Sequence, residues 1–331
     1  YGADGGRMGM MLAAPAGNDI LYDDALCAQG MNFCNKMWNA FRLVKGWEVK
    51  DMEQPTQNKK SIAWMQAKVK AVYAEINEDY SRYRLNEALM AAFKLFTDEF
   101  SGWYLEMIKP AYQAPIDRAT FDATLDIFDQ LLHVIHPFMP FITEELWQHI
   151  ADRKDGESLM VSVFKQDKPS ETEEMLLKQF EEAKQVITGA RGVRQSKNIG
   201  PREPLILEVI AGAGDDVTKE ADLSCIIRKM AGLSEIRYVS QKGDGSSSFL
   251  IGTREYAIPL GDLIDTEAEL AKAEAELKHL EGFLMGIRKK LSNERFVANA
   301  PEAVVALERK KEADSLEKIA TLKQTIESLK K

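Results

Sequence analysis

The chain has 331 residues, of which 45% are hydrophobic and 29% are charged. This is the composition of a soluble globular protein with several domains, and no stretch of about 18 apolar residues indicates a membrane span. The net charge of −9 argues weakly against a nucleic-acid partner, although local patches decide binding in a multi-domain chain. Three cysteines without metal-like spacing favour structural thiols in a reducing cytoplasm.

The first half of the chain is expected to be helical. Residues 1–19 are rich in glycine, start at Tyr1 without methionine or a signal segment, and are interpreted as a connector in a piece of a longer protein. Over residues 20–190, apolar side chains recur with helical spacing, which predicts a bundle of antiparallel helices. The expected helices span about residues 23–46, 61–80, 82–108, 117–135, 143–151 and 171–190.

The first of these helices has an unusual polar face. Its apolar face is expected in the core and consists of Phe33, Met37, Ala40, Phe41 and Val44. The other face carries three asparagines, which are mediocre helix formers, together with two cations and one leucine: Asn32, Asn35, Lys36, Asn39, Arg42 and Leu43. Four of these, Asn32, Lys36, Asn39 and Leu43, form one line along the helix. The alternatives are a solvated face, an amide contact with a neighbouring helix and, for Arg42, an ion pair within the bundle.

After the bundle the pattern changes twice. Residues 191–262 contain four short β-type runs and a helical stretch near 219–231, which predicts a small α+β unit. In residues 263–331, leucines recur every seven residues from Leu263 to Leu291, and Pro301 opens a second helix after a break. We therefore expect two helices that form an antiparallel coiled-coil hairpin.

The tip of this hairpin is expected to be basic. Between residues 286 and 311, seven basic residues oppose three acidic ones, a net charge of +4 inside a chain of −9. Such a patch suits phosphate groups, whose contacts position a nucleic acid without reading its sequence. The alternative is that these residues are the charged flanking positions of a coiled coil. The basic residues are Arg288, Lys289, Lys290, Arg295, Arg309, Lys310 and Lys311.

No catalytic or metal site is expected. His133 and His136 are three residues apart, with His149 nearby, but no third ligand type joins them, and packing is the simpler interpretation. No nucleophile–base set and no phosphate-binding glycine loop stands out.

Three motifs together resemble one family, the valyl-tRNA synthetases. "NFCNKMWNAFR" is similar to the first helix of their anticodon-binding bundle. "HPFMPFITEELWQ" resembles a segment shared with the isoleucine and leucine enzymes, and "LSNERFVANAPEAVVALERKK" resembles the coiled-coil arm of the valine enzyme. The start, "YGAD" with Arg7, looks like the stretch that follows the catalytic signature loop.

The resemblance implies the C-terminal, tRNA-binding part of such an enzyme, with a helical anticodon-binding domain and an arm that braces the outer corner of tRNA(Val). Asn32, Lys36, Asn39, Arg42 and Leu43 would contact the anticodon. The chain lacks the HIGH and KMSKS signatures, so we expect no catalysis and no cofactor in this piece. ATP and Mg would be cofactors of the parent enzyme, whose catalytic and editing domains are missing here. A cytoplasmic monomer is expected. A scaffold module with a dimerising coiled coil, or another class I synthetase, is the alternative.

Overall fold

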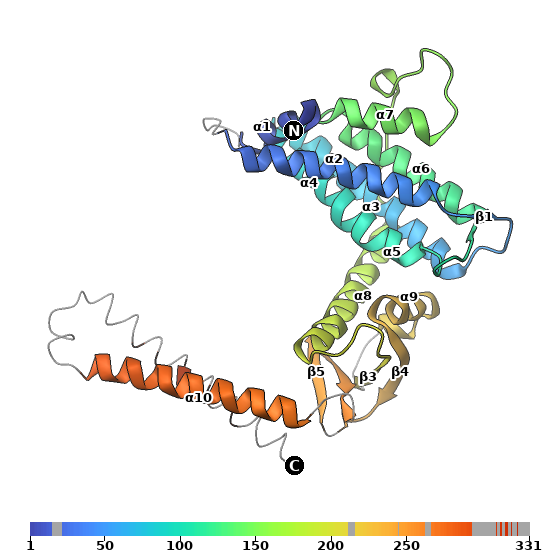
Figure 1. The fold of residues 1–331 in the computed structure, drawn as a ribbon. Helices are drawn as coiled ribbons and strands as arrows, with labels where there is room; N and C mark the ends of the chain where they lie inside the picture. Colours follow the sequence, from blue (N-terminus) through green and yellow to red (C-terminus); the bar gives the residue numbers. More distant parts are fainter. Residues whose placement is uncertain are drawn as a thin grey trace. The chain divides into compact units, whose positions relative to one another are not determined.

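The computed structural model describes residues 1–14, 22–210, 216–243, 245–261 and 266–292, and six positions in the last segment (309, 312, 315, 316, 319 and 323). For residues 266–273 and 276 it describes the backbone alone. The fold is mainly helical with a small sheet (Figure 1). In this part of the chain no helix has the length and apolar character needed to cross a membrane.

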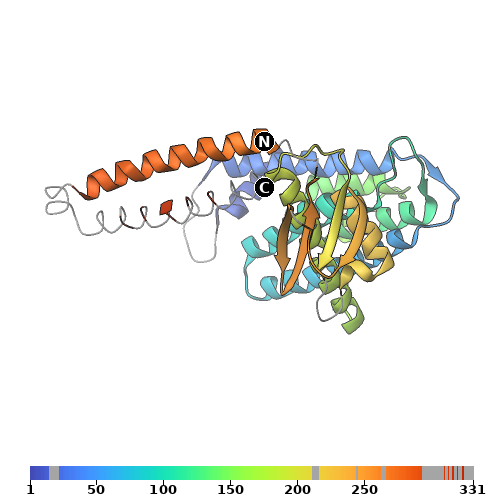
Figure 2. The same cartoon turned by 90° about the horizontal axis from the view of Figure 1, so that it is seen from below.

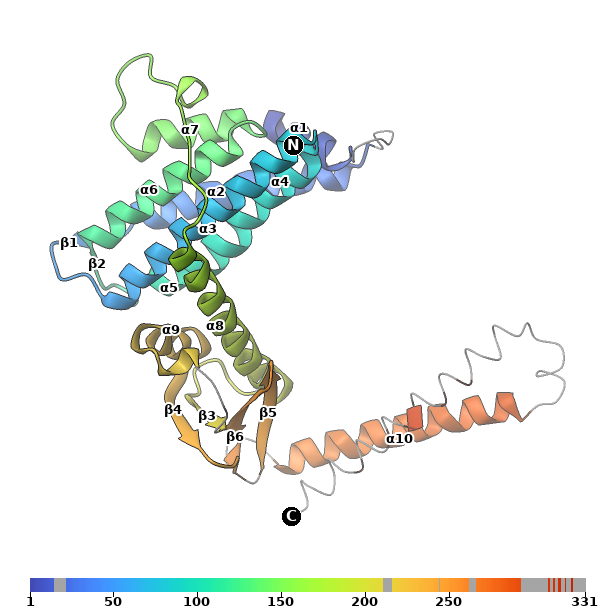
Figure 3. The same cartoon turned by 180° about the vertical axis from the view of Figure 1, so that it is seen from behind.

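The chain divides into two compact units, one of residues 1–188 and 214–233 and one of residues 189–213 and 234–331. The first, which we call the helical unit, contains α1 (Gly2–Leu12), α2 (Asp24–Lys45), α3 (Thr56–Ser81), α4 (Leu85–Lys94), α5 (Leu105–Ile108), α6 (Arg118–Ile135) and α7 (Pro140–Ile150). Seen from behind in Figure 3, α3 and α4 run side by side, and the strands β1 (Val49–Lys50) and β2 (Ile116–Asp117) form a short parallel pair at one end of the bundle. It also holds the short turns η2 (Leu159–Val161) and η3 (Val217–Lys219), α9 (Ala221–Ala231) and most of α8 (Glu171–Ser196).

Helix ends in this unit are set by local side chains. Asp23 accepts a hydrogen bond from the backbone N–H of Ala25 at 2.8 Å and begins α2, and Asp117 accepts one from Thr120 at 2.7 Å and begins α6. At the start of α8, Ser170 and Glu173 form a reciprocal capping box, in which the Ser170 N–H donates to Glu173 at 2.8 Å. These caps explain why three of the expected helices begin within one residue of the observed ones.

The helix expected over residues 82–108 contains both α-helical and π-helical segments. Between α4 and α5, residues Leu95–Tyr104 form a π-helix, η1, in place of α-helix. The break before α4 is also real, because Tyr83 has a positive φ of 58°, which an α-helix does not allow. Pi-helical turns are rare and often occur at functional sites, so the segment η1 is a candidate part of a functional site.

Residues 2–12, which we expected to be part of a connector, form helix α1 and pack on the bundle. The buried carboxylate of Asp4 accepts hydrogen bonds from the backbone N–H groups of Phe141 at 3.3 Å and Ile142 at 2.6 Å, in the first turn of α7. Arg7 donates to the carbonyl oxygen of Phe138 at 3.1 Å and to that of Pro137 at 3.3 Å. The connector interpretation missed these contacts because both partners lie more than 125 residues further along the chain.

Helices α1 and α2 cross in backbone contact (Figure 1). A Cβ atom at Gly30 would lie 2.7 Å from the carbonyl oxygen of Gly5 and 2.9 Å from its Cα atom. A Cβ atom at Gly9 would lie 2.7 Å from the backbone nitrogen of Cys27. Because glycine has no Cβ, the two backbones approach closely and enclose Met8, which is fully buried.

The core of the helical unit is aromatic. Trp64 of α3 stacks on Phe180 of α8, with ring centroids 4.9 Å apart and planes at 9°. Phe96 and Phe100 of η1 both meet Phe128 of α6 edge to face, at 5.7 and 5.4 Å. The helices of the bundle are thus held together by rings that come from different elements.

Helix α9 packs with the helical unit, whereas we had expected it among the strands. Thr56 donates to Asp222 at 2.5 Å, and Lys60 pairs with Glu220 at 2.9 Å. The Lys229 ammonium donates to the carbonyl oxygen of Met107 at 2.6 Å and stands at the end of α9. These contacts tie α9 to α3 and α5.

The second unit contains a four-stranded sheet with the order β4-β3-β6-β5, seen as yellow and orange arrows in Figure 2. The strands are β3 (Leu205–Ile210), β4 (Leu233–Val239), β5 (Ser246–Ile251) and β6 (Arg254–Pro259), and β6 runs antiparallel to both β3 and β5. Phe249 is the register partner of Tyr256, and their rings stack at 5.5 Å. A Cβ atom at Gly189 would overlap the Phe249 ring, so this glycine lets α8 approach the sheet. Helix α10 (Thr266–Leu291) follows.

Candidate nucleic-acid interface

The polar face of α2 is solvent-exposed, and the opposite face is the core. Phe33, Met37, Ala40, Phe41 and Val44 are all buried, which confirms the predicted core face. The five residues predicted to contact nucleic acid, which we call the α2 strip, are all exposed, and Leu43 keeps 45% of its surface accessible. The α2 strip consists of Asn32, Lys36, Asn39, Arg42 and Leu43.

Within the described parts of the chain, the side chains of Asn32, Asn39 and Arg42 have no hydrogen-bond or ion-pair partner. The amide contact to a neighbouring helix and the Arg42 ion pair, which the sequence left open, are therefore not formed there. The amide groups keep their donors and acceptors available, which is what the reading of a base edge requires.

Lys36 differs from its neighbours because its ammonium group is already engaged. Its Nζ atom donates to the carbonyl oxygen of Thr97 in η1 at 3.2 Å. The Thr97 hydroxyl in turn donates to the carbonyl oxygen of Phe93 at 2.9 Å. Lys36 thus joins α2 to the π-helix, while its side chain remains exposed and keeps a positive charge at the surface.

Two neighbouring grooves lie along α2, one on each side of Lys36. The first has a volume of about 360 Å³ and combines amides and Leu43 from α2 with three residues from η1 and α5: Ser101, Leu105 and Glu106. The second has a volume of about 510 Å³, shares Asn32 and Lys36, and adds Gln29, Phe93 and Asp98. Both volumes are those of small-ligand sites, so each groove has room for a planar ring. Arg42 lines neither groove.

Sequence reasoning missed the wall that η1 and α5 contribute. Leu105 is 2% exposed and follows the apolar helical pattern, so it reads as a core residue. Ser101 and Glu106 belong to no motif and are more than 60 residues away from Asn39. Their place opposite α2 follows from the tertiary packing, and no local signal in the sequence contains it.

The basic tip of the arm is described in part. Arg288, Lys289 and Lys290 form the last turn of α10, where cations also suit the helix dipole, and all three are exposed, as is Arg309. Arg288 donates to the carboxylate of Glu312 at 2.8 Å, so its charge is partly compensated. Arg295, Lys310 and Lys311 lie outside the described residues.

The histidines near α6 have structural partners. His133 contacts the carbonyl oxygen of Asp129 at 2.9 Å and the hydroxyl oxygen of Ser162 at 2.9 Å, and its ring stacks on Phe164. In the described ranges no group of three or more His, Cys, Asp or Glu side chains is arranged to hold a metal ion.

Comparison with known proteins finds family matches to two parts of this chain. The family described as anticodon-binding domain of tRNA ligase matches residues 63–211, and the valyl tRNA synthetase tRNA binding arm matches residues 265–330. The chain is 58% identical to the valine–tRNA ligase of Phocaeicola vulgatus over 331 residues, and 57% identical to that of Bacteroides thetaiotaomicron over 334. It is 50% identical to the enzyme of Parabacteroides distasonis over 332 residues.

In each of these comparisons the whole chain is covered, and it spans 37% of the length of the relative. Both domain matches occur in the order that the motifs predicted. The chain therefore belongs to the valyl-tRNA synthetase family.

Proposed function

We propose that this chain is the tRNA-binding part of a valine–tRNA ligase, and that the α2 strip contacts the anticodon of tRNA(Val). The observation that carries this proposal is the row of exposed, unengaged amides beside a base-sized groove on α2. Amides offer paired donors and acceptors to base edges, and Leu43 offers an apolar surface to a base face. The matches to tRNA ligases support the choice of RNA over another ligand.

We further propose that residues 263–331 form an antiparallel coiled-coil arm that braces the outer corner of the tRNA. Two ion pairs support this arrangement, Arg288 with Glu312 at 2.8 Å and Lys323 with Glu281 at 3.0 Å, because the later partner rises in number as the earlier one falls. The described seam residues Leu284, Ile287 and Ile319 are buried, which suits an interface between two helices. We propose that the arm begins at residue 263, whereas α1 and α9 are parts of the helical unit.

In the parent enzyme, aminoacylation with ATP, Mg and valine would take place in a catalytic domain outside this chain, and a separate editing domain would remove wrong products. The chain itself contains neither the HIGH nor the KMSKS signature, so we expect it to bind tRNA without activating valine. We propose a monomer that acts in the cytoplasm.

The test is a binding titration with Asn39→Ala. We expect its affinity for tRNA(Val) to fall by roughly 1–3 kcal/mol, the value of one base contact, and its preference over an anticodon-substituted tRNA to shrink. The matched control is Gln185→Ala, which removes an exposed amide from α8 in the same unit and should leave binding unchanged.

An equal loss of affinity for both tRNAs would show that Asn39 does not read the anticodon. Failure of the unmodified chain to prefer tRNA(Val) over the anticodon variant would favour the scaffold alternative.

A further inference from the structure

The far wall of both α2 grooves depends on the position of η1. Thr97 and Asp98 of η1 line the larger groove, and Ser101 lines the smaller one. Lys36 donates to the carbonyl oxygen of Thr97 at 3.2 Å, so α2 is bonded directly to this wall. A shift or rotation of η1 would therefore change the shape of both grooves at once.

The π-helical winding of η1 determines which of its side chains face α2. A π-helix bonds each residue to the one five positions away, whereas an α-helix bonds residues that are four positions apart. If residues 95–104 were wound as an α-helix, several of their side chains would point in other directions. Because π-helical segments of this length are rare, some interaction must favour this winding over the α-helix.

Glu99 of η1 lines neither groove and binds two lysines from other helices. Its carboxylate accepts hydrogen bonds from Nζ of Lys184 in α8 at 3.1 and 2.9 Å, and lies 3.3 Å from Nζ of Lys68 in α3. The Lys184 ammonium also lies 5.5 Å from the ring centroid of Trp103, four residues after Glu99 in η1. The three residues Lys68, Glu99 and Lys184, which we call the Glu99 clamp, thus join η1 to α3 and α8.

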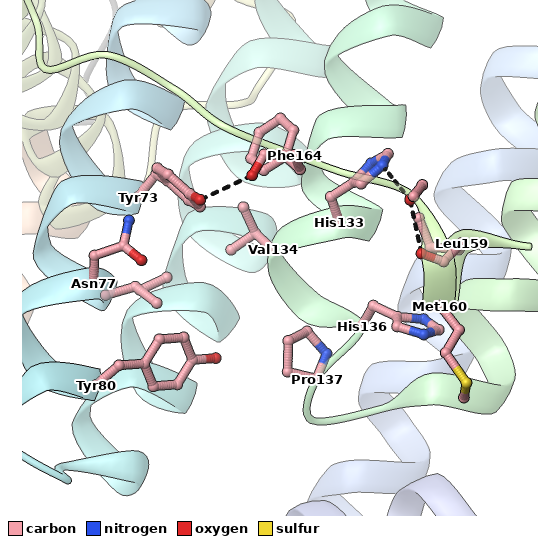
Figure 4. Close-up of a pocket in the computed structure, with 12 residues that line it drawn as sticks. Tyr73, Asn77, Tyr80, His133, Val134, His136, Pro137, Leu159, Met160 and Phe164 are labelled. Carbon is pink, nitrogen blue, oxygen red and sulfur yellow. Dashed lines mark hydrogen bonds between the residues drawn. The ribbon is translucent and has the colours of Figure 1, made fainter.

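Helix α3 gives the Glu99 clamp a fixed support. Lys70 of α3 pairs with Glu173 of α8 at 2.7 Å. The Tyr73 hydroxyl donates to the carbonyl oxygen of Phe164 at 3.0 Å, a bond that is drawn as a dashed line in Figure 4. Because these bonds hold α3 independently of η1, the Glu99 clamp positions η1 relative to α3.

The burial of the Glu99 clamp points to a role in conformation more than in stability. Lys184 is 8% exposed, and the side chain of Glu99 keeps 16% of its surface accessible. The desolvation of two charges largely cancels their attraction, so such a pair adds little to the free energy of unfolding. The carboxylate meets both ammonium groups, however, only when η1 presents Glu99 to α3 and α8. This requirement distinguishes one rotation of η1 from the others.

We propose that Glu99 is a positioning residue for tRNA recognition. Bound to Lys68 and Lys184, it fixes η1 in the π-helical winding that forms the far wall of the α2 grooves, and it acts through Thr97 and Ser101 without contacting RNA itself. This inference rests on the proposed anticodon contact of the α2 strip. It adds that the loss of the Glu99 clamp reduces the discrimination between tRNAs and leaves the attraction to phosphate groups unchanged.

The test compares Glu99→Gln with the double variant Glu99→Gln/Lys184→Met in the whole chain. Glutamine keeps the shape of glutamate but not its charge, so the single variant leaves Lys184 buried with only the exposed Glu181 beside it, at 3.3 Å. This uncompensated charge should lower the thermal stability of the helical unit. The double variant removes the ammonium group and keeps an apolar side chain, so its stability should recover.

Recognition should not recover with stability. In both variants we expect the preference for tRNA(Val) over an anticodon-substituted tRNA to fall about fivefold, the value of one weak base contact. The affinity for the substituted tRNA and the salt slope should stay the same, because no phosphate contact is lost. Without RNA, the backbone amides of η1 should exchange their hydrogens faster in both variants than in the unmodified chain.

The matched control is Lys70→Met with Glu173→Gln. It removes another ion pair between α3 and α8, one that does not touch η1. Glutamine can also replace glutamate in the capping box of α8. This control should leave both the tRNA preference and the exchange of the η1 amides unchanged.

The inference is overturned if the double variant regains the tRNA preference together with its stability, because the Glu99 clamp would then be merely structural. It is also overturned if neither variant lowers the preference, if the exchange of the η1 amides does not change, or if the control lowers the preference equally. These results would leave the proposed function intact. Only an unmodified chain without any preference for tRNA(Val) would refute the proposed function, and this inference with it.

Discussion

Replacing Gly9 by alanine should loosen the crossing of α1 and α2, whereas the same change at Gly6 should not. A Cβ atom at Gly9 would lie 2.5 Å from Sγ, 2.7 Å from the nitrogen and 2.8 Å from the Cα atom of Cys27, where ordinary contact begins at 3.4 Å. Two of these three atoms belong to the backbone, so no rotamer change relieves the overlap. Helix α1 has to move away from α2 by more than half an ångström, as the shortfall in these distances requires.

The magnitude follows from two opposing terms. Overpacking a close contact costs roughly 1–3 kcal/mol, and alanine gains about 0.8–1.0 kcal/mol over glycine in helix propensity. We expect Gly9→Ala to destabilise the packing of α1 by about 1–2 kcal/mol net. At Gly6 nothing lies within 4 Å of the added Cβ atom, so the propensity gain remains and Gly6→Ala should stabilise α1 by up to about 1 kcal/mol.

The assay measures local opening, since a chain of several domains does not unfold in one step. Cys27 is 3% exposed and lies under Gly9, so its rate of alkylation, resolved by peptide mass spectrometry, reports the opening of the crossing. Gly9→Ala should raise this rate and Gly6→Ala should lower it. If both variants change the rate in the same direction, helix propensity decides the outcome and the argument from close approach is wrong.

Three further predictions concern other contacts. Asp4→Asn should destabilise the docking of α1 by about 1–3 kcal/mol and so speed the alkylation of Cys27, because the charged acceptor for two N–H groups in the first turn of α7 is lost; an unchanged alkylation rate would contradict this role. Changing Arg288–Lys290 to alanine should weaken binding of cognate and non-cognate tRNA alike and reduce the salt slope of binding by about one unit per lost contact, while Lys278→Ala on the same helix should not. Burial disfavours the charged form of His133, but the hydrogen bonds and charge of Asp129 outweigh it and raise its pKa. The stability from this charge is therefore complete below about pH 6.5 and is lost as the pH rises through the raised pKa. The difference in the free energy of local opening of α6, measured by hydrogen exchange, between the chain and His133→Gln should shrink as the pH rises from about 6.5 through the raised pKa, and a constant difference would refute this role.

The sequence predicts best those features that depend only on residues within one helix or one strand. The two faces of α2 follow from spacing alone, because apolar side chains every three or four residues have to meet a core. The caps at Asp23 and Asp117 are equally local, since each aspartate binds a backbone N–H two or three residues away. The same is true of β3, whose inward and outward side chains alternate.

The rest depends on contacts between distant residues. Gly30 lies within the first expected helix, and the backbone of Gly5, which no periodicity in the sequence reveals, is the reason that this position is glycine. The π-helical winding of η1 leaves the apolar pattern intact, so residues 82–108 read as one helix. Lys36 was expected to contact the anticodon, and its bond to Thr97 depends on a residue that lies 61 positions further along the chain.

The contacts of α1 also determine how a mechanical load passes through the bundle. Arg7 binds two carbonyl groups in the turn between α6 and α7, and Asp4 binds the first N–H groups of α7. Both sides of this turn are therefore bonded to α1. The glycine crossing ties that helix to α2 as well. Tension applied to Tyr1 along the axis of α1 would therefore load several bonds in parallel, as shear. We expect α1 to transmit this force to the bundle and to detach only when these bonds break together.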